Sequence, residues 1–183
     1  LSEGEKELKD FVEKSGIPAA WTVLGLSALE TSHPLNVGMV GMHGNYGPNM
    51  LTNECDVLIA IGMRFDDRVT GNLETYAKQA KLIHFEIDPA EVDKNVKTAV
   101  AVLGDAKVSL REILPLIDEN SHEAWLENFH KHYEIEYEEV IKNEIYPTKS
   151  GLTMGEAIRI LNEKSGNNAV IVTDVGQHQM VAC

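Results

Sequence analysis

The sequence predicts an α/β fold in which a parallel sheet is flanked by helices, and three observations indicate it. Short apolar runs alternate with stretches of helical period along the first 120 residues. The run at residues 57–61 (VLIAI) is apolar throughout, which is typical of a strand covered on both faces. The connections between these runs contain Gly, Pro or Asp, so successive strands should pair in parallel through right-handed crossovers.

The first elements are predicted from the spacing of apolar residues and from the Gly and Pro residues that end them. Apolar residues at helical spacing predict a helix over Glu5–Ser15, with Gly16 as its C-cap. The next expected elements are a short strand at 19–24, a loop rich in Gly, Pro and Asn at 25–48, and a short helix at 49–54.

The middle of the chain continues the alternation of strands and helices. The expected elements are, in order, a strand at 56–62, a charged loop at 63–72, a helix at 73–80, strands at 81–88 and 99–103, and a helix that starts after Gly104 and Asp105. Asp105 is suited to cap that helix, because its carboxylate can accept from the first backbone N–H groups.

The last third of the chain has a different character. Residues 118–144 hold nine Asp or Glu against two Lys, with aromatic side chains at helical spacing, which predicts an acidic helix. A helix at 153–164 and a buried strand at 169–173 then open a second domain. We therefore expect three parts, at 1–120, 121–150 and 151–183, in a piece of a longer polypeptide.

Composition excludes several functions. The 29 acidic against 16 basic residues give a net charge of −13, which repels nucleic acid and anionic membrane surfaces. No apolar run approaches the ~20 residues that span a bilayer. Two cysteines make neither a disulfide framework nor a metal site.

Unusual turns follow the expected strands, and ligands of open parallel sheets bind at such strand ends. Residues 38–47 carry four glycines and His43, and residues 62–72 hold Arg64, Asp66, Asp67 and Arg68. Glycines let a backbone approach an anion, and arginines bind one through paired donors. Alternatives remain open, since the glycines suit a tight loop and the four charges could pair with one another.

Two carboxylates and a final turn complete the candidate set. Glu86 lies where a nucleotide-binding sheet accepts a ribose hydroxyl, although it could simply cap a turn, and Asp105 could be only an N-cap. Residues 174–180 turn from a strand through Gly176 into a helix, a geometry that binds phosphate. Without the final turn, the groups at 38–47, 62–72, Glu86 and 104–106 together predict a seat for an adenine dinucleotide at one sheet edge.

The motifs resemble those of acetohydroxyacid synthases, also called acetolactate synthases, which depend on thiamine diphosphate (thiamine pyrophosphate). The similar segments are 41–44 (GMHG), 64–72 (RFDDRVTGN), 83–89 (IHFEIDP), 104–106 (GDA) and 174–180 (DVGQHQM). The resemblance implies a Rossmann-like central domain with a six-stranded parallel sheet that holds FAD, followed by the first strand of a thiamine-diphosphate domain. It also implies a cytoplasmic enzyme of branched-chain amino acid biosynthesis.

Site residues carry over from the resemblance position by position. FAD is implied to contact His43, Arg64, Asp66, Arg68, Glu86, Gly104 and Asp105. Met42 and Arg68 match positions that line the substrate channel, and Gly176, Gln177 and His178 match positions that touch thiamine diphosphate.

The resemblance further implies a reaction and partners. The family decarboxylates pyruvate and joins the two-carbon unit to pyruvate or 2-ketobutyrate, in catalytic dimers or tetramers that can recruit a small regulatory subunit. Its activating glutamate and its Mg²⁺-binding motif have no counterpart here, so we expect no catalytic or metal-binding residue in this chain and no activity of the chain alone. A glyoxylate carboligase, the flavin-free catabolic acetolactate synthase and a non-enzymatic nucleotide-binding module are the alternatives.

Overall fold

The computed structural model describes residues 2–166 and 168–182 and divides the chain into two compact units. Unit 1 spans Leu1–His130 and unit 2 spans Lys131–Cys183. The boundary falls within helix α5 (Glu123–Glu136).

Five parallel strands form two sheets in the described part of unit 1. The first sheet pairs β1 (Ala19–Trp21) with β2 (Asn36–Met39), and the second has the order β3 (Val57–Ile61), β4 (Lys81–Glu86) and β5 (Val100–Leu103). The α/β class with parallel strands is therefore confirmed. The expected single sheet of six strands is wrong for the described residues, because no recorded backbone pairing joins β1 or β2 to β3.

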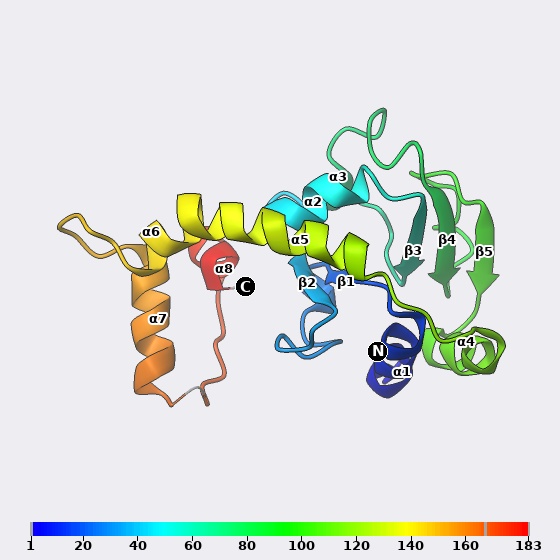
Figure 1. Ribbon diagram of the computed structural model, residues 1–183, viewed down its shortest axis with the longest axis horizontal. Helices are drawn as coiled ribbons and strands as arrows, with labels where there is room; N and C mark the ends of the chain where they lie inside the picture. Colours follow the sequence, from blue (N-terminus) through cyan, green and yellow to red (C-terminus); the bar gives the residue numbers. More distant parts are fainter. Residues whose placement is uncertain (1, 167, 183) are drawn as a thin grey trace. The chain divides into compact units, whose positions relative to one another are not determined.

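Helices flank these sheets in unit 1. They are α1 (Glu5–Ser15), α2 (Tyr46–Thr52), α3 (Asp67–Thr70) and α4 (Ala106–Ile113), with short 3₁₀ turns at Val23–Gly25 and Leu114–Leu116. Figure 1 shows α1 beside α4, and α4 in turn contacts β4. The first helix matches its predicted bounds, and its C-cap Gly16 has the left-handed φ of 66° that favours glycine.

Three other predictions for unit 1 need correction. Residues 73–80 form turns rather than a helix. Ala77 has a positive φ of 44°, and its N–H donates to Asn53 Oδ1 at 2.8 Å, so a bond to a distant residue replaces the helical pattern. Strand β2 lies inside the stretch predicted as a loop, and the run 57–61 is only partly covered, with Val57 43% exposed.

One buried apolar cluster of unit 1 packs against the charged loop that follows β3. Phe65 and Tyr76 pack edge to face with ring centroids 6.3 Å apart, and Ala60, Ala77 and Leu82 complete the buried cluster. Phe65 is 2% exposed, so it ties the charged loop to the sheet. Burial of such side chains is the main stabilising contribution at this end of the unit.

Unit 2 is helical. After α5, a π-helical turn at Tyr137–Ile141 leads to α6 (Lys142–Ile145), and α7 (Met154–Lys164) packs against α6 and α8 (Gln177–Ala182). The predicted acidic helix and the helix at 153–164 are confirmed within a few residues. The predicted strand at 169–173 is wrong: this segment is irregular, with Val170 92% and Val172 89% exposed, and none of the described strands pairs with it.

The helices in the described ranges were compared with the requirements of a membrane span. None of them combines the length and the apolar character that crossing a membrane requires.

Candidate functional site

The strand-end loops of unit 1 are joined side by side. Because β3, β4 and β5 run parallel, their carboxyl ends lie at one edge of the sheet. There, the Gly62 N–H donates to Phe85 O at 2.8 Å, and the Gly104 N–H donates to Glu86 O at 3.0 Å. The structure thus brings the loop at 62–72, Glu86 and Gly104 together at what we call the sheet edge.

The loop after β2 reaches the same region through one close contact. The Met42 N–H donates to Arg68 O at 2.7 Å. Gly41, with φ of 111°, makes this approach possible, because a Cβ at its position would lie 2.8 Å from Arg68 O. Asn49 holds Gly41 from the other side, accepting from its N–H and donating to its carbonyl, both at 2.8 Å. The glycines at 41–44 therefore serve a tight loop, as one of the alternatives held.

The segment 62–72, which we call the arginine loop, presents its two guanidinium groups differently. Arg64 Nε lies 3.5 Å from Asp66 Oδ2, yet the Arg64 side chain stays 70% exposed. Asp66 also caps α3, where its Oδ1 accepts from the Arg68 N–H at 3.0 Å. Arg68 is exposed, and within the described ranges no ion pair of its side chain is recorded. The mutual pairing considered from the sequence thus applies to Arg64 and Asp66 alone.

Glu86 uses part of its carboxylate for a turn. Its Oε1 accepts from the N–H groups of Ile87 at 2.9 Å and Asp88 at 3.1 Å, while its Oε2 lies 3.7 Å from His84 Nε2. The side chain is 9% exposed. The turn-capping alternative is therefore realised, and only a small part of the carboxylate faces solvent.

The remaining candidate residues of unit 1 lie directly after β5 and in the loop after β2. Asp105 caps α4, because its Oδ1 accepts from the Val108 N–H at 3.1 Å. Gly104 precedes it at the end of β5. Met42 and His43 are exposed in the loop after β2. The exposed side chains of Met42 and His43 are therefore accessible to a ligand.

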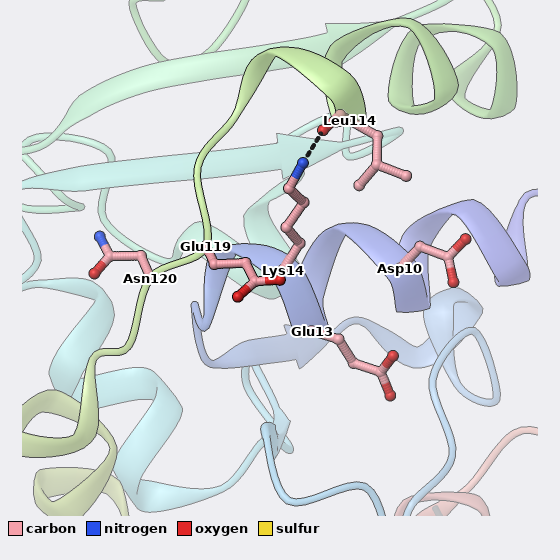
Figure 2. A pocket seen from close by; sticks show the side chains of 6 residues that line it. All are labelled: Asp10, Glu13, Lys14, Leu114, Glu119 and Asn120. Atoms are coloured by element: carbon pink, nitrogen blue, oxygen red, sulfur yellow. Dashed lines mark hydrogen bonds between the residues drawn. The ribbon is translucent and has the colours of Figure 1, made fainter.

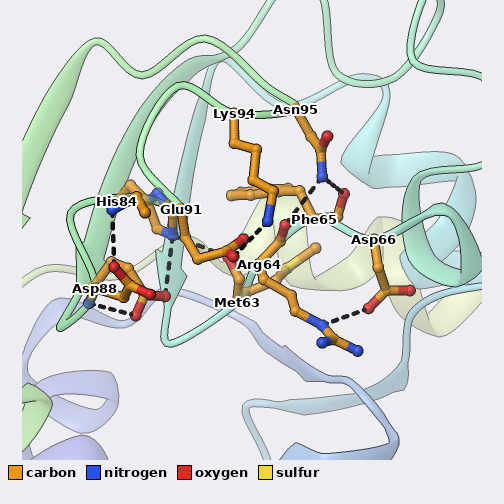
Figure 3. Close-up of polar contacts among 11 residues, drawn as sticks. Met63, Arg64, Phe65, Asp66, His84, Asp88, Glu91, Lys94 and Asn95 are labelled. Atoms are coloured by element: carbon orange, nitrogen blue, oxygen red, sulfur yellow. Dashed lines mark hydrogen bonds and ion pairs between the residues drawn. The ribbon is translucent and has the colours of Figure 1, made fainter.

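Sequence reasoning missed two residues that hold the arginine loop, shown in Figure 3. Asn95, on the connection between β4 and β5, donates through Nδ2 to Phe65 O at 2.9 Å and lies 3.4 Å from Arg64 O. His84 places Nε2 2.9 Å from Met63 O. A carbonyl only accepts, so this nitrogen must carry the hydrogen. Nothing local in the sequence signals Asn95, since its partners are about 30 positions earlier.

Burial changes the acidity of two side chains of unit 1, Tyr76 and Cys55. Burial, with a smaller effect of the nearby Cys55, raises the pKa of Tyr76 to about 12. Burial and then the charge of Asp56 raise the pKa of the Cys55 thiol. Both groups therefore stay neutral at ordinary pH, which suits structural rather than reactive roles.

The candidate segment of unit 2 forms the expected turn into a helix. Asp174 Oδ1 accepts from the Val175 N–H at 2.7 Å, and α8 begins at Gln177, directly after Gly176. A Cβ on Gly176 would lie 2.8 Å from the His178 ring. Gln177 and His178 are exposed.

A hollow of about 420 Å³ lies between α1 and the segment that follows α4 (Figure 2). Its lining includes the carboxylates of Asp10, Glu13 and Glu119, and its one lysine, Lys14, donates to Leu114 O at 2.9 Å. This acidic lining does not suit an anionic cofactor. Across the described residues, no three His, Cys, Asp or Glu side chains are grouped as a metal site would require.

Comparison with known proteins places this geometry in a family. The family model described as "Thiamine pyrophosphate enzyme, central domain" matches residues 1–113. The chain is 40% identical to the probable acetolactate synthase large subunit of Methanocaldococcus jannaschii over 98% of its length, and 40% identical to the acetolactate synthase large subunit of Parasynechococcus marenigrum over 96%. It is 36% identical to the chloroplastic acetolactate synthase 1 of Nicotiana tabacum over 99%.

The chain spans about a third or less of the length of these relatives. It spans 31%, 28% and 27% of them, respectively. Within that share lie the parallel strands, the joined strand-end loops and the residues that the family model matches. The chain therefore belongs to the thiamine pyrophosphate enzymes, in the region of their central domain.

Proposed function

We propose that the chain is part of the large subunit of an acetolactate synthase and that its sheet edge binds FAD. One observation carries this proposal: the loops at 40–45 and 62–72, with Glu86 and Gly104, are hydrogen-bonded side by side in a chain whose relatives are acetolactate synthase large subunits. The corresponding domains are an FAD-binding part at 1–120, an acidic helix and linker at 121–150, and the start of a thiamine-diphosphate domain at 151–183.

The side chains at the sheet edge fit a diphosphate. Arg64 and Arg68 both expose guanidinium groups, and each group can donate two parallel hydrogen bonds to phosphate oxygens. Asp66 orients Arg64 through their 3.5 Å contact and fixes the Arg68 backbone through its N-cap bond. These residues would bind the anion, and Met42 with Arg68 would line the path to the substrate.

Other positions at the edge contribute through shape and polarity. Glu86 and Asp105 already cap a turn and a helix, so we assign them to the rim of the flavin site, where the remaining oxygens can accept ligand hydroxyls. Gly104 lets the chain pass close to the ligand, and the exposed ring of His43 can donate to it. The bound flavin serves structure in this proposal, and no redox step is assigned to it.

The reaction requires groups beyond this chain. Thiamine diphosphate supplies an electron sink for decarboxylating pyruvate, and Gly176, Gln177 and His178 would contact its phosphates or ring. Mg²⁺ and the activating carboxylate would be held by residues outside this sequence. Pyruvate and 2-ketobutyrate are the proposed substrates of a cytoplasmic dimer or tetramer with a regulatory subunit, in branched-chain amino acid biosynthesis.

Removing Arg64 tests the flavin site. In the complete subunit, Arg64→Ala should weaken FAD binding by ~10- to 100-fold, because a charge-assisted hydrogen bond contributes about 1.5–3 kcal/mol. Flavin absorbance after purification and a fluorescence titration measure the effect. Arg111→Ala, which removes an exposed arginine from α4, is the matched control and should leave the flavin content unchanged. Equal flavin content in all three proteins would contradict the proposal.

A further inference from the structure

Three consecutive backbone carbonyl groups of the arginine loop are held by side chains from other parts of unit 1. Met63 O accepts from His84, and the carbonyls of Arg64 and Phe65 face Nδ2 of Asn95, as Figure 3 shows. His84 comes from strand β4 and Asn95 from the connection to β5. Two side chains remote in sequence therefore fix the backbone on both sides of Arg64.

This arrangement holds a conformation that the loop would not favour alone. Phe65 has φ of 54°, a left-handed value that is uncommon for residues with a side chain. Its ring is 2% exposed and packs edge-on to His84, with centroids 5.2 Å apart. With Phe65 buried and its carbonyl bonded, the preceding Arg64 side chain is directed outward, where it is 70% exposed.

Asn95 and His84 differ in what else they do. His84 is 1% exposed and belongs to the packed interior, so changing it also disturbs the core. Asn95 is exposed, and its recorded side-chain bonds go to the arginine loop alone within the described ranges. A change at Asn95 therefore removes the support of the loop without opening a cavity.

We infer that Asn95, assisted by His84, is a positioning residue for Arg64: it keeps the arginine loop in its left-handed turn so that the guanidinium is ready for an anion. This inference rests on the proposed function, because the anion in question is the FAD diphosphate. Preorganisation of this kind raises affinity by reducing the ordering that binding requires. Asn95 itself need not touch the ligand.

Affinity measurements in the complete subunit test this coupling. Asn95→Ala should weaken FAD binding by roughly fivefold, the effect of losing about one hydrogen bond. In the Arg64→Ala background the same substitution should change the affinity by less than about twofold, because its effect passes through Arg64. The matched control is Asn143→Ala, which removes an exposed asparagine of unit 2 whose Nδ2 donates to the carbonyls of Glu138 and Glu139, and it should not alter FAD affinity.

Trypsin gives a readout that needs no flavin. The Arg64–Phe65 bond is shielded while Phe65 stays buried, so trypsin must wait for the loop to open. In the 183-residue chain, Asn95→Ala should speed cleavage at this bond by roughly fivefold, whereas Asn143→Ala should leave its rate unchanged. Asn95→Asp, which keeps the shape but lacks the donor, should behave like Asn95→Ala.

The outcomes separate the two proposals. If Arg64→Ala leaves FAD affinity unchanged while Asn95→Ala speeds cleavage, the flavin site is wrong and the support of the loop stands. If Arg64→Ala weakens binding but Asn95→Ala has no effect, or an equal effect with and without Arg64, the positioning role is overturned. Equal cleavage rates at Arg64 in the original chain and in Asn95→Ala would also overturn it.

Discussion

Gly41→Ala should break the junction between the loop after β2 and the arginine loop. The new Cβ would lie 2.8 Å from Arg68 O and 3.3 Å from Val69 Cα, and both are backbone atoms that cannot rotate away. The backbone adds a second cost, since φ at this position is 111°. The Met42 N–H bond to Arg68 O would have to lengthen or break as the two loops separate.

The expected loss of stability combines the two effects. A left-handed conformation costs an alanine about 1–2 kcal/mol. Forcing extra atoms into a packed site costs about 1–3 kcal/mol more. We therefore expect the free energy of unfolding to fall by roughly 2–5 kcal/mol, a large part of the total stability of a typical domain.

A matched glycine isolates the steric part of this effect. Gly62→Ala places a Cβ at a position with φ of 64° and no atom within 4 Å, so it should cost only the backbone term of about 1–2 kcal/mol. Urea unfolding measures both variants in a Trp125→Phe background, where the fluorescence comes from Trp21 alone. Trp21 adjoins this loop through the bond from the Val40 N–H to its carbonyl. If the two variants lose the same stability, the close approach of the loops is wrong.

Two further predictions concern pH and helix capping. Because burial raises the pKa of Tyr76 to about 12 from 10, the folded state keeps a proton that the unfolded chain releases, so stability should fall by about 2 kcal/mol as pH rises from 10 to 12. Urea titrations at pH 9, 10.5 and 11.5 measure this loss. The free energy of unfolding of Tyr76→Phe should fall less steeply with pH than that of the original chain, and equal slopes would argue against the burial of Tyr76. Asp105→Ala should lower stability by about 1 kcal/mol through loss of the α4 cap, whereas the exposed Asp118→Ala should not, and equal melting curves for the two variants would refute this role.

The parts of the fold that could be predicted depend on local signals. Helix α1 shows helical spacing and a glycine cap, and β3 is a continuous apolar run, so both were found within a residue or two. Strand β2 lacks such a signal: it reads NVGM, and it is a strand because β1 pairs with it. The short helix α3 did carry a signal, an aspartate at its N-cap, that the dense charges around it obscured.

Errors arose where tertiary contacts override local preference. Residues 73–80 look helical, but Asn53 accepts from the Ala77 N–H and the Tyr76 ring enters the core, so turns replace the helix. The segment 169–173 has the composition of a buried strand, yet a strand requires a neighbour, and the described residues provide none. The composition of a segment shows that it can form a strand, but whether it does so depends on a neighbouring strand with which it can pair.

For the candidate site, the sequence predicted the position of the residues better than their hydrogen-bond partners. The sequence predicted which turns would meet at the sheet edge, because parallel pairing brings strand ends together wherever the strands are identified. It could not predict which polar atoms would already be bonded there. Glu86 and Asp105 accept from nearby backbone N–H groups, whereas the guanidinium of Arg68 has no ion pair recorded among the described residues. An anion binds most readily to a guanidinium whose donors are not already occupied within the protein. The exposed arginines therefore indicate the position of the ligand better than the carboxylates do.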